Sequence, residues 1–247
     1  MQRSRSPWNL AFSLVALLLS ASPVWASGGL NLSWGDCGNA GTLQRTFACD
    51  TNVGADVLYL SVVAPVPVGQ LDAVEMTLYL RTDQPVPAPW WHFETGGCRG
   101  GLSPPALGFS IDFTANSACA DPWFGLGAAG GTILEQGPYV FGQARLRAVA
   151  AIPGTTSIDN TTEYYLCKIV ISHQRTLTCA GCAGGACIEF QTATLAQPAG
   201  VGDVIVSNPL GRNFVVWQSG IDGTGSSCPG PVPTRASTWG SIKAMYR

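Results

Sequence analysis

The sequence predicts an all-β fold, an antiparallel β-sandwich followed by a short C-terminal helix, on three observations. Several segments alternate apolar and polar residues with the two-residue period of a strand that buries one face. The 30 glycines and 17 prolines cluster between these segments, and both residue types disfavour long helices. The segments do not alternate with helical patterns, which disfavours a parallel α/β sheet.

The alternation is clearest in the segment 74–81, where Val74, Met76 and Leu78 are separated by Glu75 and Thr77. Similar patterns, and short runs rich in β-branched and aromatic residues, give seven expected strands: 57–63, 74–81, 109–113, 145–152, 164–171, 188–194 and 214–217. Turns are expected in the clusters of Gly, Pro, Ser and Asn at 85–89, 96–105, 125–131 and 220–233.

The C-terminal helix is expected from Trp239, Ile242 and Tyr246, which recur at near-helical spacing after a Ser-Thr cap at 237–238. Neither a linker nor an internal repeat divides the chain. Residues 27–247 are therefore expected to form a single, disulfide-stabilised β-sandwich domain.

The first 26 residues are typical of a signal peptide. Arg3 and Arg5 supply positive charge, an apolar run occupies 10–19, and small residues flank Trp25 before the expected cleavage after Ala26. The run is too short to span a bilayer, which needs about 20 residues, and no later segment is long and apolar enough. These features predict a secreted or cell-surface protein without a transmembrane segment in the mature chain.

The overall composition excludes two other classes. Hydrophobic residues make up 46% of the chain, too many for a disordered protein. The net charge is −2 and basic residues form no run, so the sequence predicts no nucleic-acid partner.

Nine cysteines follow the signal peptide, and in an oxidising compartment they are disulfide candidates before they are metal ligands. Cys167 is expected to be the unpaired one, because it lies inside the strand-like segment 164–171, where a free thiol behaves as a small hydrophobe. Proximity in sequence suggests the bridges Cys37–Cys49 and Cys98–Cys119. Two further bridges are expected among four cysteines, with three connectivities left open: Cys179, Cys182, Cys187 and Cys228.

The features that could carry catalysis are sparse. His92 and His173 are the only histidines, and neither is part of a nucleophile-elbow motif. The spacing Cys179-x-x-Cys182-x4-Cys187 lacks a second close pair, so a structural role is favoured and neither a metal nor another cofactor is expected. A hydrolase would need two cooperating carboxylates, and the spacing selects no pair from the candidates with apolar neighbours: Glu94, Glu135, Glu163 and Glu189.

Aromatic residues in turn-like segments are the candidate contact residues. The run 90–93 (WWHF) contains Trp90 and Trp91, Arg99 lies just beyond it, and Trp123 occupies a later loop. Exposed tryptophans stack on sugar rings or accept apolar and cationic groups of a protein partner. In an extended segment adjacent side chains point to opposite sides, so one of the adjacent pair would be buried. The alternative is that both are packing residues.

Four segments, 30–38, 49–52, 179–182 and 238–247 (LNLSWGDCG, CDTN, CAGC and TWGSIKAMYR), give the chain a family resemblance. It resembles secreted, disulfide-rich bacterial proteins of unassigned function over most of the mature length, and this resemblance brings no functional residues with it. The strand pattern is also similar to that of cohesin-like and carbohydrate-binding-module-like sandwiches, an analogy at the level of the fold.

These observations favour a secreted, non-enzymatic binding protein. It would recognise a polysaccharide or an extracellular protein through aromatic-rich loops, with Trp90, Trp91, Trp123 and Arg99 as the contact residues. One alternative is a structural or assembly subunit of an extracellular layer or appendage. Another is a carboxylate-dependent hydrolase.

Overall fold

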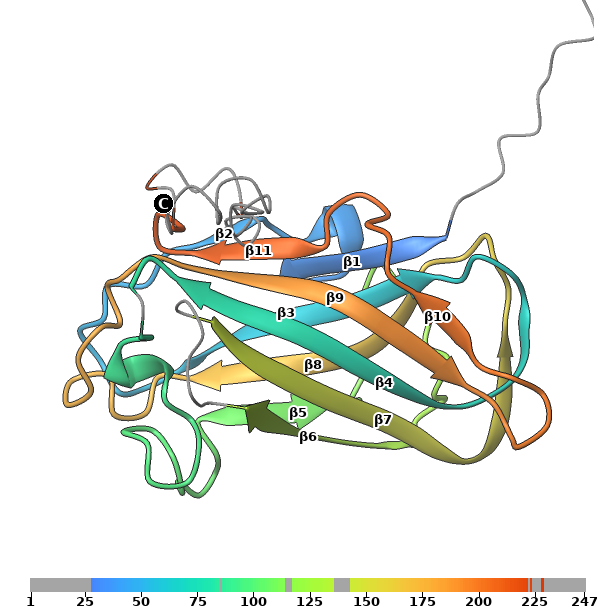
Figure 1. Ribbon diagram of the computed structural model, residues 1–247, viewed down its shortest axis with the longest axis horizontal. Coiled ribbons are helices and arrows are strands. Elements are labelled where there is room, and N and C mark those ends of the chain that lie inside the picture. The colour runs from blue at the N-terminus through green and yellow to red at the C-terminus, as the bar shows by residue number, and fades with distance from the viewer. Residues whose placement is uncertain are drawn as a thin grey trace, which may run out of the picture.

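The computed structural model describes residues 28–84, 86–113, 117–135, 143–221, 223 and 228, with 130–135 described by their backbone alone. The expected signal peptide, its cleavage point and the expected C-terminal helix lie outside these residues. Within them the fold is a β-sandwich of two sheets, as predicted (Figure 1). None of the helices in this part of the chain is long and apolar enough to cross a membrane.

The smaller sheet has four antiparallel strands. In spatial order they are β1 (Gly29–Trp34), β3 (Ala55–Val63), β8 (Tyr164–Ser172) and β5 (Leu107–Ser110). Strand β8 contains the expected free cysteine, Cys167, which is buried and unpaired as predicted.

The larger sheet has seven strands, and only the contact between β2 and β11 is parallel. The spatial order is β2 (Gln44–Arg45), β11 (Phe214–Trp217), β9 (Ala186–Ala196), β4 (Val68–Thr82), β7 (Gln143–Ile158) and β6 (Ala128–Glu135), with β10 (Val204–Val206) also paired to β9. Two short 3₁₀ turns complete the described elements: η1 (Gly38–Ala40) and η2 (Pro89–Trp91).

The core between the sheets follows the alternation of the sequence. On β4 the buried side chains of Val74, Met76 and Leu78 alternate with partly exposed ones, and β3 adds Leu58 and Leu60 from the opposite sheet. Each fully buried aliphatic side chain of this kind stabilises the fold by about 1.5–3 kcal/mol relative to exposure.

Two sequence-based expectations about strands were wrong. The segment 125–131 was expected to be a turn, but β6 begins at Ala128, because small residues pair along β7 without any apolar alternation. The segment 109–113 was expected to be a strand with a buried face, but β5 ends at Ser110 and the residues after it leave the sheet.

The sandwich is closed on one side and open on the other. Along the outer edge of β1, Leu30 and Leu32 donate backbone hydrogen bonds to Asn208 and Arg212 (both 2.8 Å). The segment that leads into β11 thus covers this edge. On the opposite side, β5 and β6 lie side by side but belong to different sheets (Figure 1).

All eight cysteines expected to form disulfides do so, but Cys37–Cys49 and Cys98–Cys119 were wrong. Of the two bridges expected among Cys179, Cys182, Cys187 and Cys228, only Cys187–Cys228 is formed. The bridges are Cys37–Cys119, Cys49–Cys182, Cys98–Cys179 and Cys187–Cys228. Sequence neighbours were a poor guide because the sheets bring distant loops to the same end of the sandwich. The segments around Cys49 and Cys98 both meet the loop that follows β8 there (Figure 1).

The buried thiol of Cys167 generates a testable prediction. Burial raises the pKa of this thiol from its ordinary value to about 12, and only a thiolate is an efficient nucleophile. The oxidised native protein should therefore react with no equivalent of a thiol reagent at pH 8, and with one equivalent after unfolding without reductant. A rapid reaction of the native protein would contradict the burial of Cys167.

Candidate functional site

Both tryptophans of the η2 turn are buried, which overturns their expected role as contact residues. The extended geometry that would have separated them is absent, because Pro89–Trp91 is a 3₁₀ turn that directs both indoles inward. The ring of Trp90 packs at 4.6 Å from that of Trp91 and stacks at 5.0 Å on that of Trp217. Trp90 and Trp91 are core residues, in agreement with the alternative that both are packing residues.

Trp123 is also buried, so its expected contact role was wrong as well. Its indole nitrogen donates to the carbonyl oxygen of Leu166 at 3.0 Å, which ties the loop after Cys119 to strand β8. Cys119 is bonded to Cys37 and not to Cys98, so the bridge that would have joined the two tryptophan loops is not formed.

Arg99, the fourth expected contact residue, is only 1% exposed. Its guanidinium lies 3.9 Å from the ring centre of Trp90 and donates to the backbone carbonyls of Trp90, Gln174 and Ser172. Burial lowers its pKa to about 9. The side chain therefore ties its own loop to the η2 turn and to the segment 172–174, which is a structural role.

Both histidines hold structural positions. In His173, Nε2 lies 2.9 Å from a carboxylate oxygen of Asp56 and Nδ1 lies 3.0 Å from the carbonyl oxygen of Val53. In His92, Nδ1 faces Glu94 and Nε2 faces the carbonyl oxygen of Pro87, both at 2.8 Å. All four ring nitrogens lie within hydrogen-bond distance of oxygen atoms of the fold, so both rings are held in place by the structure.

The candidate carboxylates and metal ligands are likewise engaged. Glu163 accepts from Asn31 and Ser61, and Glu189 is paired with Arg81 at 2.7 Å; the side chain of Glu135 is among those not described. The cysteines of the C-x-x-C motif are bonded to two different partners, Cys98 and Cys49. In the described parts of the chain, no three His, Cys, Asp or Glu residues gather in a metal-binding group.

The open side of the sandwich holds a candidate binding site. A hollow of about 530 Å³ lies between the end of β5 and the start of β6, and a smaller one of about 270 Å³ shares Phe109 with it. Because Phe109 lines both hollows, we call the two together the seam groove. The larger one is lined by Phe109, Ser110, Ile111, Asp112, Phe113, Asp121, Gly125, Gly127, Ala128 and Ala129.

A rigid loop forms one wall of the seam groove and displays two apolar side chains. Phe124 and Leu126 are 70% and 65% exposed, and we call this pair the apolar tip. The loop is held by the Cys37–Cys119 disulfide and by a hydrogen bond from the Trp123 backbone to Asp121 Oδ1 at 2.8 Å. Phe124 has a φ of 51°, a backbone conformation that is rare for a bulky residue and concentrates at functional positions.

The sequence contained a signal for this site that was not recognised. Phe109, Ile111 and Phe113 were expected to face the core, but they are half-buried because the chain leaves the sheet after Ser110. The tip residue Leu126 lies between two glycines. An apolar residue between two glycines in a loop does not belong to an alternating strand pattern. Its side chain is therefore a candidate for contact with a binding partner.

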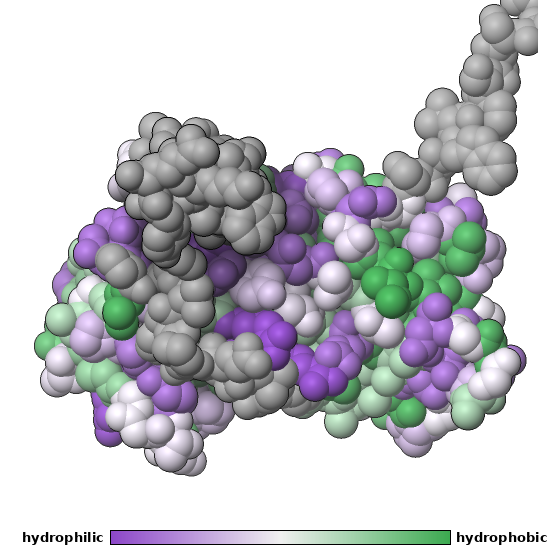
Figure 2. All heavy atoms as spheres, viewed as in Figure 1, coloured by the Kyte–Doolittle hydropathy of each residue, from purple (hydrophilic) through white to green (hydrophobic). Residues whose placement is uncertain are grey.

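A second exposed apolar area lies around β10, at the end of the molecule that shows a green patch in Figure 2. Ile205 is 66% exposed there, and Val201 and Leu210 are also exposed. Single exposed hydrophobic residues are common on protein surfaces. Val201, Ile205 and Leu210 line neither hollow of the seam groove.

No family model matches the chain, and no curated protein sequence matches it. Among solved structures, it is similar to a cohesin module from the family 33 glycoside hydrolase of Clostridium perfringens ATCC13124. The identity is 9% over 74% of this chain and 97% of that module, with a TM-score of 0.35. The two sheets themselves define the sandwich architecture.

The role of Arg99 can be tested by stability. Arg99→Met should lower the free energy of unfolding by about 2–4 kcal/mol, because three buried carbonyl groups lose their donor. Arg147→Met is the matched control, since it breaks an exposed ion pair with Glu75 worth about 0–1 kcal/mol. Denaturant titration with the disulfides intact measures both, and equal effects would contradict the cross-linking role.

Proposed function

We propose that the protein is a non-enzymatic binding module that recognises an extended, apolar segment of a partner protein in the seam groove. The observation that supports this most directly is the apolar tip, because a disulfide, a buried tryptophan and a side-chain hydrogen bond all hold it outward. A preorganised apolar contact loses little conformational entropy on binding. The four disulfides are typical of an extracellular or oxidising environment.

The chemistry of the groove favours a protein segment over a sugar. Sugar-binding surfaces rely on flat aromatic faces, whereas the wall of this groove includes the branched side chain of Ile111. The apolar tip next to the groove likewise combines Phe124 with the branched side chain of Leu126. An edge strand such as β5 or β6 also offers backbone groups that an extended peptide can pair with.

The alternatives receive less support. Hydrolysis would need two cooperating carboxylates, and Glu94, Glu163 and Glu189 each hold their own structural partner. Assembly into a layer would bring a second copy of the chain to the same groove. The experiment below distinguishes that outcome by the oligomeric state.

A peptide-display screen against the oxidised protein tests the proposal. We expect it to enrich peptides with alternating apolar residues, and the double variant Phe124→Ser/Leu126→Ser should bind the best of them at least about tenfold more weakly, a loss of about 1.4 kcal/mol. Because both side chains are exposed, the stability of the variant should change by less than about 0.5 kcal/mol.

Ile205→Ser is the matched control, since it removes an equally exposed apolar side chain from β10, away from the loop that forms the groove wall. Weaker peptide binding by this control, with normal binding by the double variant, would place the contact surface at β10 and refute the proposal. Binding to insoluble polysaccharide but not to peptides would favour a glycan ligand. Concentration-dependent oligomers lost in the double variant would favour self-assembly.

A further inference from the structure

Strand β5 has an unpaired outer edge. It ends the smaller sheet and pairs with β8 on one side only. Hydrogen bonds between antiparallel strands join every second pair of opposite residues. The amide of Ser172 donates to the carbonyl oxygen of Ala106 at 2.9 Å, and these residues continue the register of β8 and β5. The alternation therefore directs the backbone groups of Gly108 towards β8, and those of Leu107 and Phe109 to the outer edge.

The outward backbone groups of β5 face the seam groove. Within the described residues, no hydrogen bond reaches the backbone of Leu107 or Phe109 from this outer side. Both residues line the smaller hollow, and Phe109 also lines the larger one. A molecule in the groove thus meets a row of alternating backbone donors and acceptors. An extended peptide is the ligand whose own backbone matches such a row.

The facing strand β6 is shielded where it begins. A Cβ atom on Gly127 would lie 2.5 Å from Cδ1 of Ile111, so the backbone that enters β6 packs directly against this side chain. Ile111 follows directly after β5, and the smaller hollow extends away from it along 105–109. Of the two edges at the open side, β5 is therefore the one at which a strand can be added.

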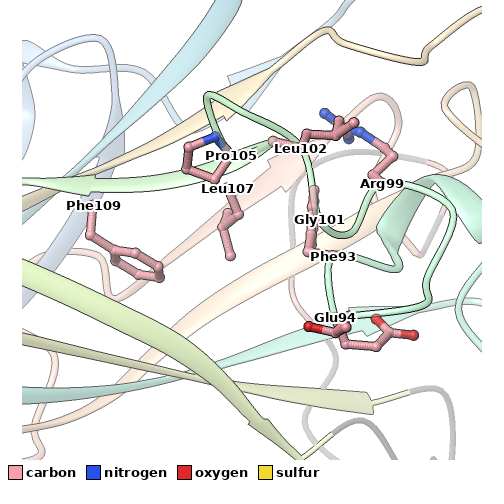
Figure 3. Close-up of a pocket in the computed structure, with 10 residues that line it drawn as sticks. Phe93, Glu94, Arg99, Gly101, Leu102, Pro105, Leu107 and Phe109 are labelled. Atoms are coloured by element: carbon pink, nitrogen blue, oxygen red, sulfur yellow. The ribbon is translucent and has the colours of Figure 1, made fainter.

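The side chains of β5 define what an added strand would place in the groove. Leu107 belongs to the core and Phe109 packs against it, and both side chains lie on the same side of β5 in Figure 3. Opposite residues of neighbouring strands point to the same face of a sheet. Residues paired with Leu107 and Phe109 would therefore point into the hollows, and the residue between them would point to the other face. The matching segment has an apolar residue at every second position.

Resting on the proposed function, we infer that the partner segment binds by strand addition to the outer edge of β5. The backbone groups of Leu107 and Phe109 form its hydrogen bonds, and the segment becomes a fifth strand beside the four of the smaller sheet. Its apolar side chains occupy the hollows beside Phe109. The backbone of β5 thus fixes the position of the segment, and the apolar tip adds side-chain contacts.

The first test uses a defined probe, the acetylated and amidated peptide KTVTVTK, whose two valines are separated by one threonine. Amide NMR spectra of the oxidised wild-type protein should show saturable shifts of the Leu107 and Phe109 amides. N-methylation of both valines removes the N–H groups that would face β5, so this peptide should bind at least about tenfold more weakly.

The matched control is the same peptide N-methylated at its second and fourth residues, both threonines, whose N–H groups would point away from β5. It should bind within about twofold of the unmodified probe. Equal losses with the two methylated peptides, no saturable shift at Leu107 and Phe109, or shifts at the amides of β6 instead, would overturn the inference. These measurements use the wild-type chain and do not depend on the folding of a variant.

A pair of variants tests the same edge from the side of the protein. Phe109→Ala and Phe109→Pro both remove the ring, but only proline removes the outward N–H group. Proline is tolerated on an edge strand where the N–H group does not pair with the neighbouring strand. Phe109→Pro should bind the probe about fivefold more weakly than Phe109→Ala. Equal binding by two folded variants would contradict the role of this N–H group.

The outcomes separate strand addition from the proposed function. If the probe binds at β5 but no peptide from the display screen depends on the apolar tip, strand addition is confirmed and the proposed function fails. If the enriched peptides depend on the apolar tip but neither they nor the probe lose affinity when alternate residues are N-methylated, the proposed function is confirmed and strand addition fails.

Discussion

Trp217 joins parts of the chain that would otherwise be independent. It lies on β11 of the larger sheet, and its ring is 6.0 Å from that of Trp34 on β1 of the smaller sheet. Trp90 stacks on it at 5.0 Å, and its indole nitrogen donates to the carbonyl oxygen of Cys182 at 2.7 Å. Large aromatic side chains contribute much of the energy of a core, and this cluster fixes the η2 turn against both sheets. Phe93 and Arg99, which line the smaller hollow, follow closely after η2, so the position of this wall depends on Trp217.

The contrast between the two sides of the sandwich explains why a binding surface lies where it does. The backbone groups along the outer edge of β1 are hydrogen-bonded to the segment 208–212. The edges of β5 and β6 face each other without pairing, and the half-buried side chains after Ser110 fill only part of the space between them. Unpaired strand edges invite association with other chains. In this fold the edges of β5 and β6 lie beside the loop that carries the apolar tip, so association with another chain is expected at this side of the sandwich.

The sequence predicted the sandwich from strands that bury one face. The interior strands β3, β4, β7, β8, β9 and β11 were all expected. Burial alternates along β4 and the first half of β7, whereas β3 and β11 are buried over most of their length. Strand β6 was missed because alanine and glycine carry no alternation, and β10 was missed because it is only three residues long. The tryptophans were misassigned because their orientation depends on a 3₁₀ turn, and the disulfide pairing depends on which loops the sheets bring together.

The disulfide connectivity has a consequence for the resistance of the chain to proteases. The bridges Cys37–Cys119 and Cys49–Cys182 overlap along the sequence, and Cys187–Cys228 begins just after them. A single cleavage almost anywhere between Cys37 and Cys228 would therefore leave the two halves covalently joined. The exception is the short interval between Cys182 and Cys187, which no bridge spans. Its last residue, Ala186, is buried at the start of β9, so the ordered sheet itself limits access to part of this unspanned interval.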